Sequence, residues 1–174
     1  MAGGCLVVVR ILVSAAFAVL ALIALAVTGE KTVRTTVIIK APAPLVWSVL
    51  TDSERYSEWN PMYVHAEGTY RVGETLVYER KGAAGERTTL QFTIREAREE
   101  EVLHQQGGTP FLFTYDHRWV LEPYDGGTRA TQIEVLRGLG VWFWNPTYLK
   151  TPYVDVNTAL DARVRDLQKP VPPS

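Results

Sequence analysis

The sequence predicts an α+β fold in which a curved antiparallel sheet of about seven strands wraps around one long C-terminal helix. Three observations predict it. Residues 11–27 carry no charged side chain, residues 62–137 divide into a series of strand-like segments of which 88–97 and 111–121 alternate between two faces, and residues 153–167 carry apolar side chains at helical spacing. A sheet and a helix that each have one apolar face bury those faces against each other. The uncharged N-terminal stretch precedes this domain as a separate helix.

The N-terminal stretch is long enough to cross a membrane. Residues 6–27 carry no charge except at Arg10, and about 20 such residues span a bilayer. We expect a single-pass anchor, and Arg10 can extend its charge toward the lipid headgroups. The alternatives are a secretory signal cleaved after Ala26, which would release the protein, and a buried core helix. Positive charges stand on both sides of the stretch, so the side of the membrane is left open.

Composition excludes several classes of function. The chain has 18 Lys+Arg and 19 Asp+Glu, a balance that argues against a nucleic-acid partner. Its 47% hydrophobic and 10% aromatic content argues against disorder. The single cysteine, Cys5, lies in the N-terminal stretch, so the domain has no disulfide, cysteine-ligated zinc or cysteine nucleophile. We expect an anchor or signal segment at 1–30, one domain at 31–169 and a flexible tail at 170–174.

The domain begins with a strand and two short helices. Residues 35–40 are mostly β-branched and predict a strand, which a proline-rich turn closes. Residues 45–50 place apolar side chains at helical spacing and predict a short helix. A second short helix is expected at 54–59, because Asn60 precedes a proline and is therefore disfavoured in helical conformation.

The middle of the domain predicts six further strands. Leu90, Phe92 and Ile94 fall on one face of a half-buried strand, since side chains alternate with period two. The sequence Tyr-Asp-Gly-Gly at 124–127 is typical of a tight hairpin turn between the last two strands. The expected strands span residues 62–66, 75–80, 88–97, 101–106, 111–121 and 128–137.

The C-terminal segment predicts the long helix. Pro152 suits the first turn of this helix, or it kinks a helix that begins near Thr147. Lys169 and Pro170 end it. The expected buried stripe consists of Tyr153, Val156, Leu160, Val164 and Leu167.

Two segments resemble a known family. The sequence 39–62, with Ala-Pro-x-x-x-Val-Trp at 41–47 and Trp-Asn-Pro at 59–61, is similar to the opening signature of the SRPBCC superfamily, also called START-like or helix-grip. The pattern His-x-Trp-x-Leu-x-Pro at 117–123, followed by Gly-Gly-Thr-Arg at 126–129, resembles its penultimate hairpin. The likeness covers residues 33–168, and the preceding apolar stretch resembles membrane-anchored bacterial members described as polyketide cyclase/dehydrase-like.

The resemblance implies a helix-grip fold with a cavity between the sheet and the last helix. Such a cavity would favour a lipid, an isoprenoid or quinone, or a polyketide-like ligand. The resemblance also implies that the same scaffold hosts carriers, cyclases, hydrolases and co-chaperones, so a cavity does not fix the activity. The candidate wall residues, each of which could instead fill the core, are Tyr78, Phe92, Tyr115, His117, Trp119, Trp142, Trp144, Tyr148 and Tyr153.

His117 is the main polar candidate. It alternates in register with aromatic residues, so we expect it to point inward, where Glu134 on the next strand could be its hydrogen-bond partner. Such a pair could serve structure, contact a ligand, or perform acid-base catalysis on a lipophilic substrate. The three histidines lack metal-ligand spacing, and no dinucleotide or phosphate-loop motif is present, so we expect no metal and no cofactor.

The run Val-Trp-Phe-Trp at 141–144 stands apart, since four bulky neighbours cannot all face inward. It could gate the cavity, touch the bilayer, dock a protein partner of unknown identity, or pack as an ordinary loop. The function that these patterns favour is a membrane-tethered module for a hydrophobic small molecule. The alternatives are an enzyme that uses His117 and a protein-interaction module.

Overall fold

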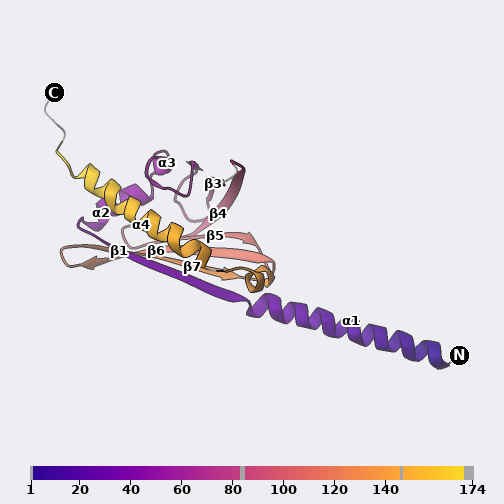
Figure 1. The fold of residues 1–174 in the computed structure, drawn as a ribbon. Coiled ribbons are helices and arrows are strands. Elements are labelled where there is room, and N and C mark those ends of the chain that lie inside the picture. The colour runs from indigo at the N-terminus through magenta and orange to yellow at the C-terminus, as the bar shows by residue number, and fades with distance from the viewer. Residues whose placement is uncertain (1, 83–84, 146, 171–174) are drawn as a thin grey trace.

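Seven antiparallel strands form one curved sheet, and a long helix lies across its concave face (Figure 1). The computed structural model describes residues 2–82, 85–145 and 147–170, with side chains from residue 7 onward. Residues 171–174 of the expected tail lie outside the described residues. The elements are α1 (Ala2–Thr28), β1 (Glu30–Ile39), α2 (Ala43–Leu50), α3 (Tyr56–Trp59), β2 (His65–Glu67), β3 (Thr75–Lys81), β4 (Arg87–Arg98), β5 (Val102–Thr109), β6 (Phe113–Tyr124), β7 (Gly127–Arg137), the 3₁₀ helix η1 (Leu139–Phe143) and α4 (Thr147–Leu167).

The strand order is β1-β7-β6-β5-β4-β3-β2, so the first and last strands of the chain are neighbours. The predicted fold class is therefore confirmed, including the two short helices between the first two strands. Strands β2 to β7 begin and end within three residues of their expected bounds. The pairing of β4 with β5 shifts register between Ile94 and Glu96, and such a bulge bends a strand. This bend lets the sheet curl around α4.

Strand β1 is longer than predicted and starts at Glu30 instead of residue 35. It pairs with β7 along its whole length, from Glu30 opposite Arg137 to Ile39 opposite Thr128. The sequence did not predict this extension, because the first residues of the strand are mostly charged or polar. Only Gly29 separates β1 from α1, and a Cβ atom at this position would lie 2.5 Å from the Gly138 carbonyl oxygen. The end of the sheet next to α1, called the proximal end below, is therefore fixed close to that helix.

Strand β6 runs from Phe113 to Tyr124, so it begins two residues later and ends three residues later than predicted. At its distal end, Asp125 and Gly126 have φ angles of 50° and 70°, the left-handed pair that a type I′ hairpin turn requires, as the Asp-Gly sequence predicts. At its proximal end, Phe111 has a φ of 65° and is 69% exposed, so it belongs to the preceding turn and not to the strand.

Helix α4 starts at Thr147, five residues before Pro152, so the proline lies inside the helix. Since proline has no N–H group, the Tyr148 carbonyl lacks its usual helical donor. The predicted stripe of Tyr153, Val156, Leu160 and Val164 is buried, together with Asn157. The fifth predicted member, Leu167, is 50% exposed, because it lies in the last turn at the end of the sheet.

The core lies at the distal end, where α4 packs directly on the sheet and on α2. Leu160 and Val164 are fully buried, as are Val46 of α2, Ile39 of β1 and Ala130 of β7. Toward the proximal half of α4 this packing gives way to an open space beside the buried Tyr153, and a second hollow of about 180 Å³ lies between the C-terminal turns of α4 and the α2–α3 segment.

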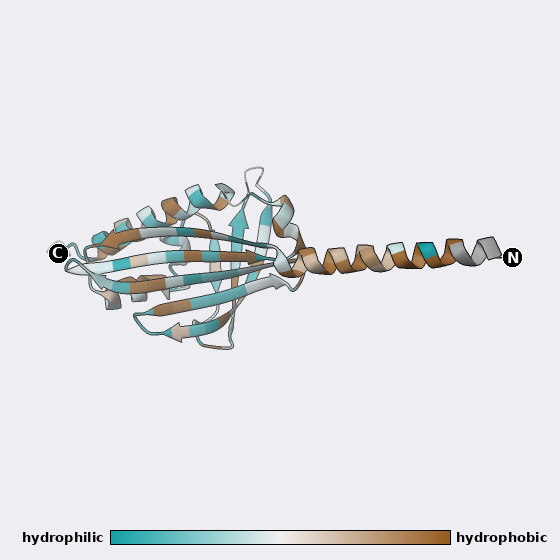
Figure 2. Ribbon diagram, turned by 90° about the horizontal axis from the view of Figure 1, so that it is seen from below, coloured by the Kyte–Doolittle hydropathy of each residue, from teal (hydrophilic) through white to brown (hydrophobic). Residues whose placement is uncertain are grey.

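Helix α1 projects away from the domain as a continuous apolar rod (Figure 2). Residues Val7–Thr28 have a mean hydropathy of 2.7, and none of this stretch is buried. The predicted span at residues 6–27 therefore falls within one apolar helix of the kind found in membrane anchors and in signal sequences.

Replacing Leu160 by alanine should lower the free energy of unfolding by about 2–5 kcal/mol, because the lost side chain leaves a cavity in the distal core. The matched control is Val154→Ala on the exposed face of the same helix, where we expect a change within about 0.5 kcal/mol. Urea unfolding of the full chain in detergent, followed by tryptophan fluorescence, measures both. Equal effects of the two substitutions would contradict the described seating of α4.

Candidate ligand-binding cavity

Two adjoining spaces lie between the sheet and the proximal half of α4. The inner compartment has a volume of about 20 Å³ and the outer compartment one of about 200 Å³. The inner one has room for about one water molecule, whereas the outer one admits a larger group. The residues that line both compartments are Met62, Tyr63, Phe92, Glu134 and Tyr153.

The two compartments differ in the residues that line them. Polar side chains from the sheet face the inner one, notably Gln105, His117 and Gln132. The outer one is mainly apolar, and its further lining residues are Arg80, Leu90, Phe113, Tyr115, Leu136, Trp144 and Leu149. Both compartments expose more apolar than polar surface, so the polar side chains are isolated hydrogen-bonding points in an apolar lining.

A buried amide pair joins α4 to the sheet. Gln132 on β7 donates from Nε2 to Asn157 Oδ1 at 2.6 Å and to the Tyr153 carbonyl at 3.0 Å. Both amide side chains are buried. These two hydrogen bonds tie the proximal half of α4 to β7. The cavity lies beside this contact.

Glu134 is the most unusual group in the cavity. It is 2% exposed, and its Oε2 accepts a hydrogen bond of 2.6 Å from the Tyr153 hydroxyl. Its Oε1 is buried and has no hydrogen-bond partner among the described residues. Burial raises the pKa of Glu134 to about 7, although the Tyr153 bond opposes the shift. A buried oxygen without a partner costs about 1–3 kcal/mol, so such atoms often mark a place for a ligand or a water.

His117 faces inward, as its register predicts, and lines the inner compartment. It lies directly opposite Glu134 in the β6–β7 ladder, but its Nε2 meets Gln132 Oε1 at 3.4 Å instead of the carboxylate. The expected His117–Glu134 hydrogen bond is thus absent, because Glu134 turns toward Tyr153 on the helix. Burial lowers the pKa of His117 to about 4, so the imidazole is neutral at pH 7.

Aromatic rings build the wall opposite α4. Tyr63 contacts Tyr78 with ring centres 4.7 Å apart, Tyr78 contacts Phe92 at 5.5 Å, and Phe92 contacts Tyr115 at 4.8 Å. The Tyr78 hydroxyl donates to Gln105 Oε1 at 3.0 Å. Burial raises the pKa of Tyr63 and of Tyr78, so both phenols are neutral at pH 7. The wall therefore presents rings and neutral hydroxyls.

The structure separates the predicted wall residues into three groups. Trp119, at 1% exposed, packs in the core edge-on to His117. Trp142 lies against α1, and Tyr148 lines a hollow at the surface. Those that line a compartment are Tyr78, Phe92, Tyr115, His117, Trp144 and Tyr153.

Sequence reasoning missed several cavity residues. Gln105 lies directly opposite His117 in the β5–β6 ladder, and Gln132 lies two residues before Glu134, so both could have been found once His117 was assigned an inward face. Tyr63 could not, because the strand predicted at residues 62–66 begins only at His65 and the preceding residues form a loop.

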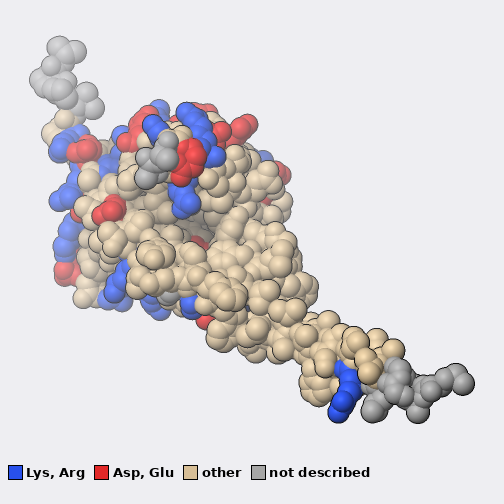
Figure 3. All heavy atoms as spheres, turned by 45° about the vertical axis from the view of Figure 1, so that its right-hand side comes forward, with Lys and Arg blue, Asp and Glu red and all other residues tan. Residues whose placement is uncertain are grey.

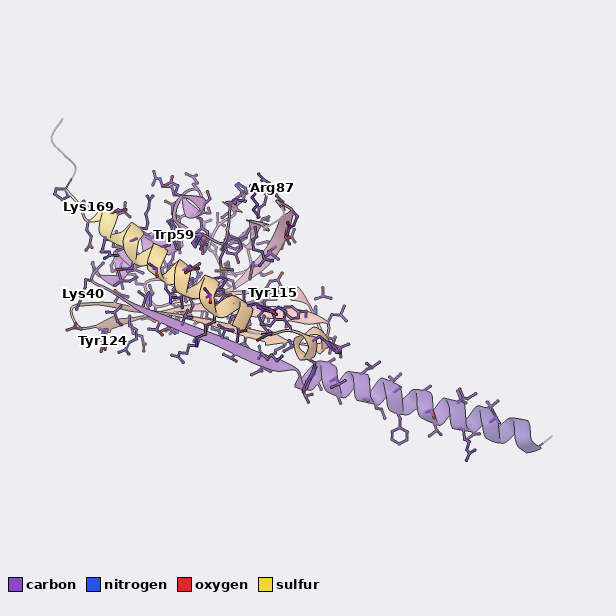
Figure 4. The ribbon with its side chains drawn as sticks, viewed as in Figure 1. Lys40, Trp59, Arg87, Tyr115, Tyr124 and Lys169 are labelled. Atoms are coloured by element: carbon purple, nitrogen blue, oxygen red, sulfur yellow. The ribbon has the colours of Figure 1, made fainter. Side chains whose placement is uncertain are left out.

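The cavity opens at the proximal end. A surface hollow of about 290 Å³ shares Met62, Arg80 and Leu149 with the outer compartment. Figure 3 shows a hollow in this face, with charged side chains on one side and an uncharged surface between it and α1. In Figure 4, Tyr115 of the outer compartment lies near the α1 end of the sheet. Among the described residues, no group of three or more His, Cys, Asp or Glu side chains could hold a metal ion.

Several solved structures share the fold of this chain. The chain resembles protein Ms6760 from Mycobacterium smegmatis at 19% identity over 82% of this chain and 99% of that one, with a TM-score of 0.64. It resembles NE0264 from Nitrosomonas europaea at 17% identity over 79% and 96%, with a TM-score of 0.67. The di-domain ARO/CYC BexL from the BE-7585A biosynthetic pathway is 16% identical over 83% and 52%, with a TM-score of 0.61. At these identities the likeness shows the fold alone.

Sequence comparison identifies the family. No functionally curated protein matches the chain. The family described as polyketide cyclase / dehydrase and lipid transport matches residues 30–165, which is nearly all of the chain outside α1. The resemblance carried by the sequence motifs is therefore confirmed, and the chain belongs to this SRPBCC-type polyketide cyclase/dehydrase and lipid-transport family.

Proposed function

We propose that the domain binds a hydrophobic small molecule whose polar end reaches Glu134. The observation that carries this proposal is the buried, unpartnered Oε1 atom of Glu134 in a cavity lined by aromatic and aliphatic side chains. A ligand that forms a hydrogen bond with this atom removes the cost of leaving it unpaired.

The protonation state of the site defines the polar end. With a pKa of about 7, Glu134 holds a proton in much of the population at neutral pH. Since the Tyr153 hydroxyl already donates to Oε2, we place the proton on Oε1, where it can be donated to the ligand. His117 and the cavity tyrosines are neutral and offer no charge. The preferred ligand is therefore uncharged at this end and carries a carbonyl, ether or hydroxyl oxygen.

The shape of the cavity defines the rest of the ligand. The outer compartment of about 200 Å³ is smaller than the 300–1,000 Å³ of typical ligand pockets, so a larger ligand continues into the surface hollow. Leu90, Phe113 and Leu136 offer it an apolar surface. Isoprenoids, quinones, lipids and polyketide-like molecules combine such a body with an oxygen-bearing end.

We further propose that α1 anchors this domain, at residues 31–169, to a membrane. Its 27 residues extend about 40 Å at 1.5 Å per residue, which exceeds the hydrocarbon thickness of a bilayer. The Trp142 indole donates to the Leu25 carbonyl at 2.9 Å, so the last turn of α1 takes part in the packing of the domain. Cleavage after Ala26 would remove this contact, which favours retention of α1.

A second candidate function is catalysis on the same kind of molecule. Glu134, with its raised pKa, could protonate a bound carbonyl oxygen, as a cyclase or dehydratase requires. Chemical identity of the recovered ligand separates the two functions. A carrier returns the molecule unchanged after incubation, whereas an enzyme converts it and His117→Ala or Glu134→Gln slows the conversion.

Replacing Leu90 by tryptophan should fill the outer compartment and expel the ligand. The full chain is purified in detergent, extracted with organic solvent, and the extract is identified by mass spectrometry. We expect one recurrent hydrophobic species from the wild type. The amount recovered from Leu90→Trp should be at least about tenfold lower, because a loss of about 1.4 kcal/mol in binding free energy already weakens binding tenfold. Val154→Trp on the exposed face of α4 is the control, because it adds the same side chain outside the cavity. Equal recovery from all three chains would assign the lipid to the micelle and refute the proposal.

The pH dependence of stability tests the state of Glu134. Its pKa rises from 4.5 to about 7 on folding, so the folded chain binds more protons than the unfolded chain between these values and loses stability as pH increases. In Glu134→Gln this loss is absent. The free energy of unfolding of the variant, relative to wild type, should therefore increase by about 3 kcal/mol between pH 4.5 and pH 7.

His117 supplies a control of opposite sign. Its pKa falls from 6.5 to about 4 on folding, so its contribution to stability increases with pH across this range. Relative to wild type, His117→Asn should therefore lose stability as pH increases from 4 to 6.5. Urea unfolding at several pH values measures both variants. A pH-independent difference between Glu134→Gln and wild type would refute the raised pKa.

A further inference from the structure

Five large apolar or aromatic side chains are exposed at the proximal end of the domain. Phe111 is 69% exposed, Leu112 59%, Trp142 51%, Phe143 87% and Tyr148 71%. They come from the turn before β6, from η1 and from the first turn of α4. Scattered single residues of this kind are ordinary, but a group on one surface marks an interaction site. We call these five residues the rim.

Backbone hydrogen bonds join the first two rim segments into one unit. The Leu139 N–H donates to the Phe111 carbonyl at 2.9 Å, and the Gly140 N–H donates to the Leu112 carbonyl at 2.8 Å. Gly138 has a φ angle of 113°, and a Cβ atom at this position would lie 2.7 Å from the Leu112 carbonyl oxygen. The two backbones therefore approach each other closely. The rim is thus a fixed part of the proximal end.

The same unit is attached to the last turn of α1. The Gly138 N–H donates to the Gly29 carbonyl at 3.0 Å, and the Trp142 indole donates to the Leu25 carbonyl at 2.9 Å. If α1 spans a bilayer, this attachment places the rim at the level where the helix leaves the lipid. Tryptophan and tyrosine favour this interfacial region, where one part of the ring is apolar and another is wet.

The cavity mouth lies beside the rim. Tyr148 belongs to the rim and also lines the surface hollow, and its neighbour Leu149 lines both the hollow and the outer compartment. Figure 3 shows an uncharged surface between the hollow and α1 and charged side chains of both signs on the other side of the hollow. The charged residues that line the hollow are Arg80, Lys81 and Asp155. An uncharged surface next to an apolar helix, bordered by charged side chains of both signs, matches the order of acyl chains and polar headgroups in a lipid leaflet.

We propose that the rim inserts into the leaflet from which α1 emerges and holds the cavity mouth against the lipid. This inference rests on the proposed anchoring by α1 and deepens the proposed function, because it makes the ligand a molecule that resides in the membrane. Such a ligand moves between leaflet and cavity without crossing water. The partner of this surface is a lipid bilayer and not a protein.

Site-specific fluorescence in vesicles tests the insertion. The full chain with Cys5→Ser carries Phe143→Cys, labelled with an environment-sensitive fluorophore, and is reconstituted into phosphatidylcholine vesicles that contain spin-labelled lipid. The matched control is Tyr124→Cys, an exposed aromatic position at the opposite end of the sheet (Figure 4). We expect emission at a shorter wavelength and several-fold stronger lipid quenching at position 143 than at position 124.

Water-like emission and weak quenching at both positions, in chains that float with the vesicles, would overturn the proposal. Ligand recovery from the detergent-purified chain is independent of this result. A water-exposed label together with a recovered ligand refutes the rim and spares the cavity. A quenched label with no recovered ligand supports the rim and refutes the cavity.

Discussion

The way α4 is seated on the concave sheet determines the rest of this structure. At the distal end Leu160 and Val164 meet the sheet and α2 in dense apolar contact. At the proximal end the hydrogen bond of 2.6 Å between Gln132 and Asn157 ties the helix to the sheet. The same helix thus covers the apolar core with Leu160 and Val164 and borders the cavity with Tyr153. The hydrogen-bonded amides cost little to bury, so the helix is tied to the sheet without an unpaired group at the contact.

Among the described residues at the cavity, Glu134 is the buried group that lacks a full set of hydrogen bonds. It lies next to the amide pair, takes one hydrogen bond from Tyr153 and leaves its second oxygen unpaired. A core built only for stability would place an apolar residue here. The neutral His117 and the neutral tyrosines around it form a polar but uncharged floor. Such a floor selects a ligand by hydrogen bonding and shape, and the mainly apolar outer compartment leads from it to a mouth of mixed polarity beside the rim.

The sequence was sufficient for the fold but only for part of the site. Alternation along residues 113–121 correctly placed Tyr115, His117 and Trp119 on one face, and the Asp-Gly turn fixed the last hairpin. Three features could not be predicted from the sequence. The charged start of β1 forms a strand because it pairs with β7. Tyr63 lines the cavity from a loop. Glu134 accepts its hydrogen bond from the Tyr153 hydroxyl on α4 and not from His117. Each depends on a contact between distant segments, which periodicity does not encode.

The most direct test of this account is a crystal structure of the full chain purified with its bound lipid and solved at a resolution that separates water from ligand. The account predicts elongated density in the outer compartment, with an oxygen atom within hydrogen-bonding distance of Glu134 Oε1 and an apolar body directed toward Leu149 and the mouth. Density for isolated water molecules alone in both compartments, or a ligand oriented with its apolar end at Glu134, would contradict it.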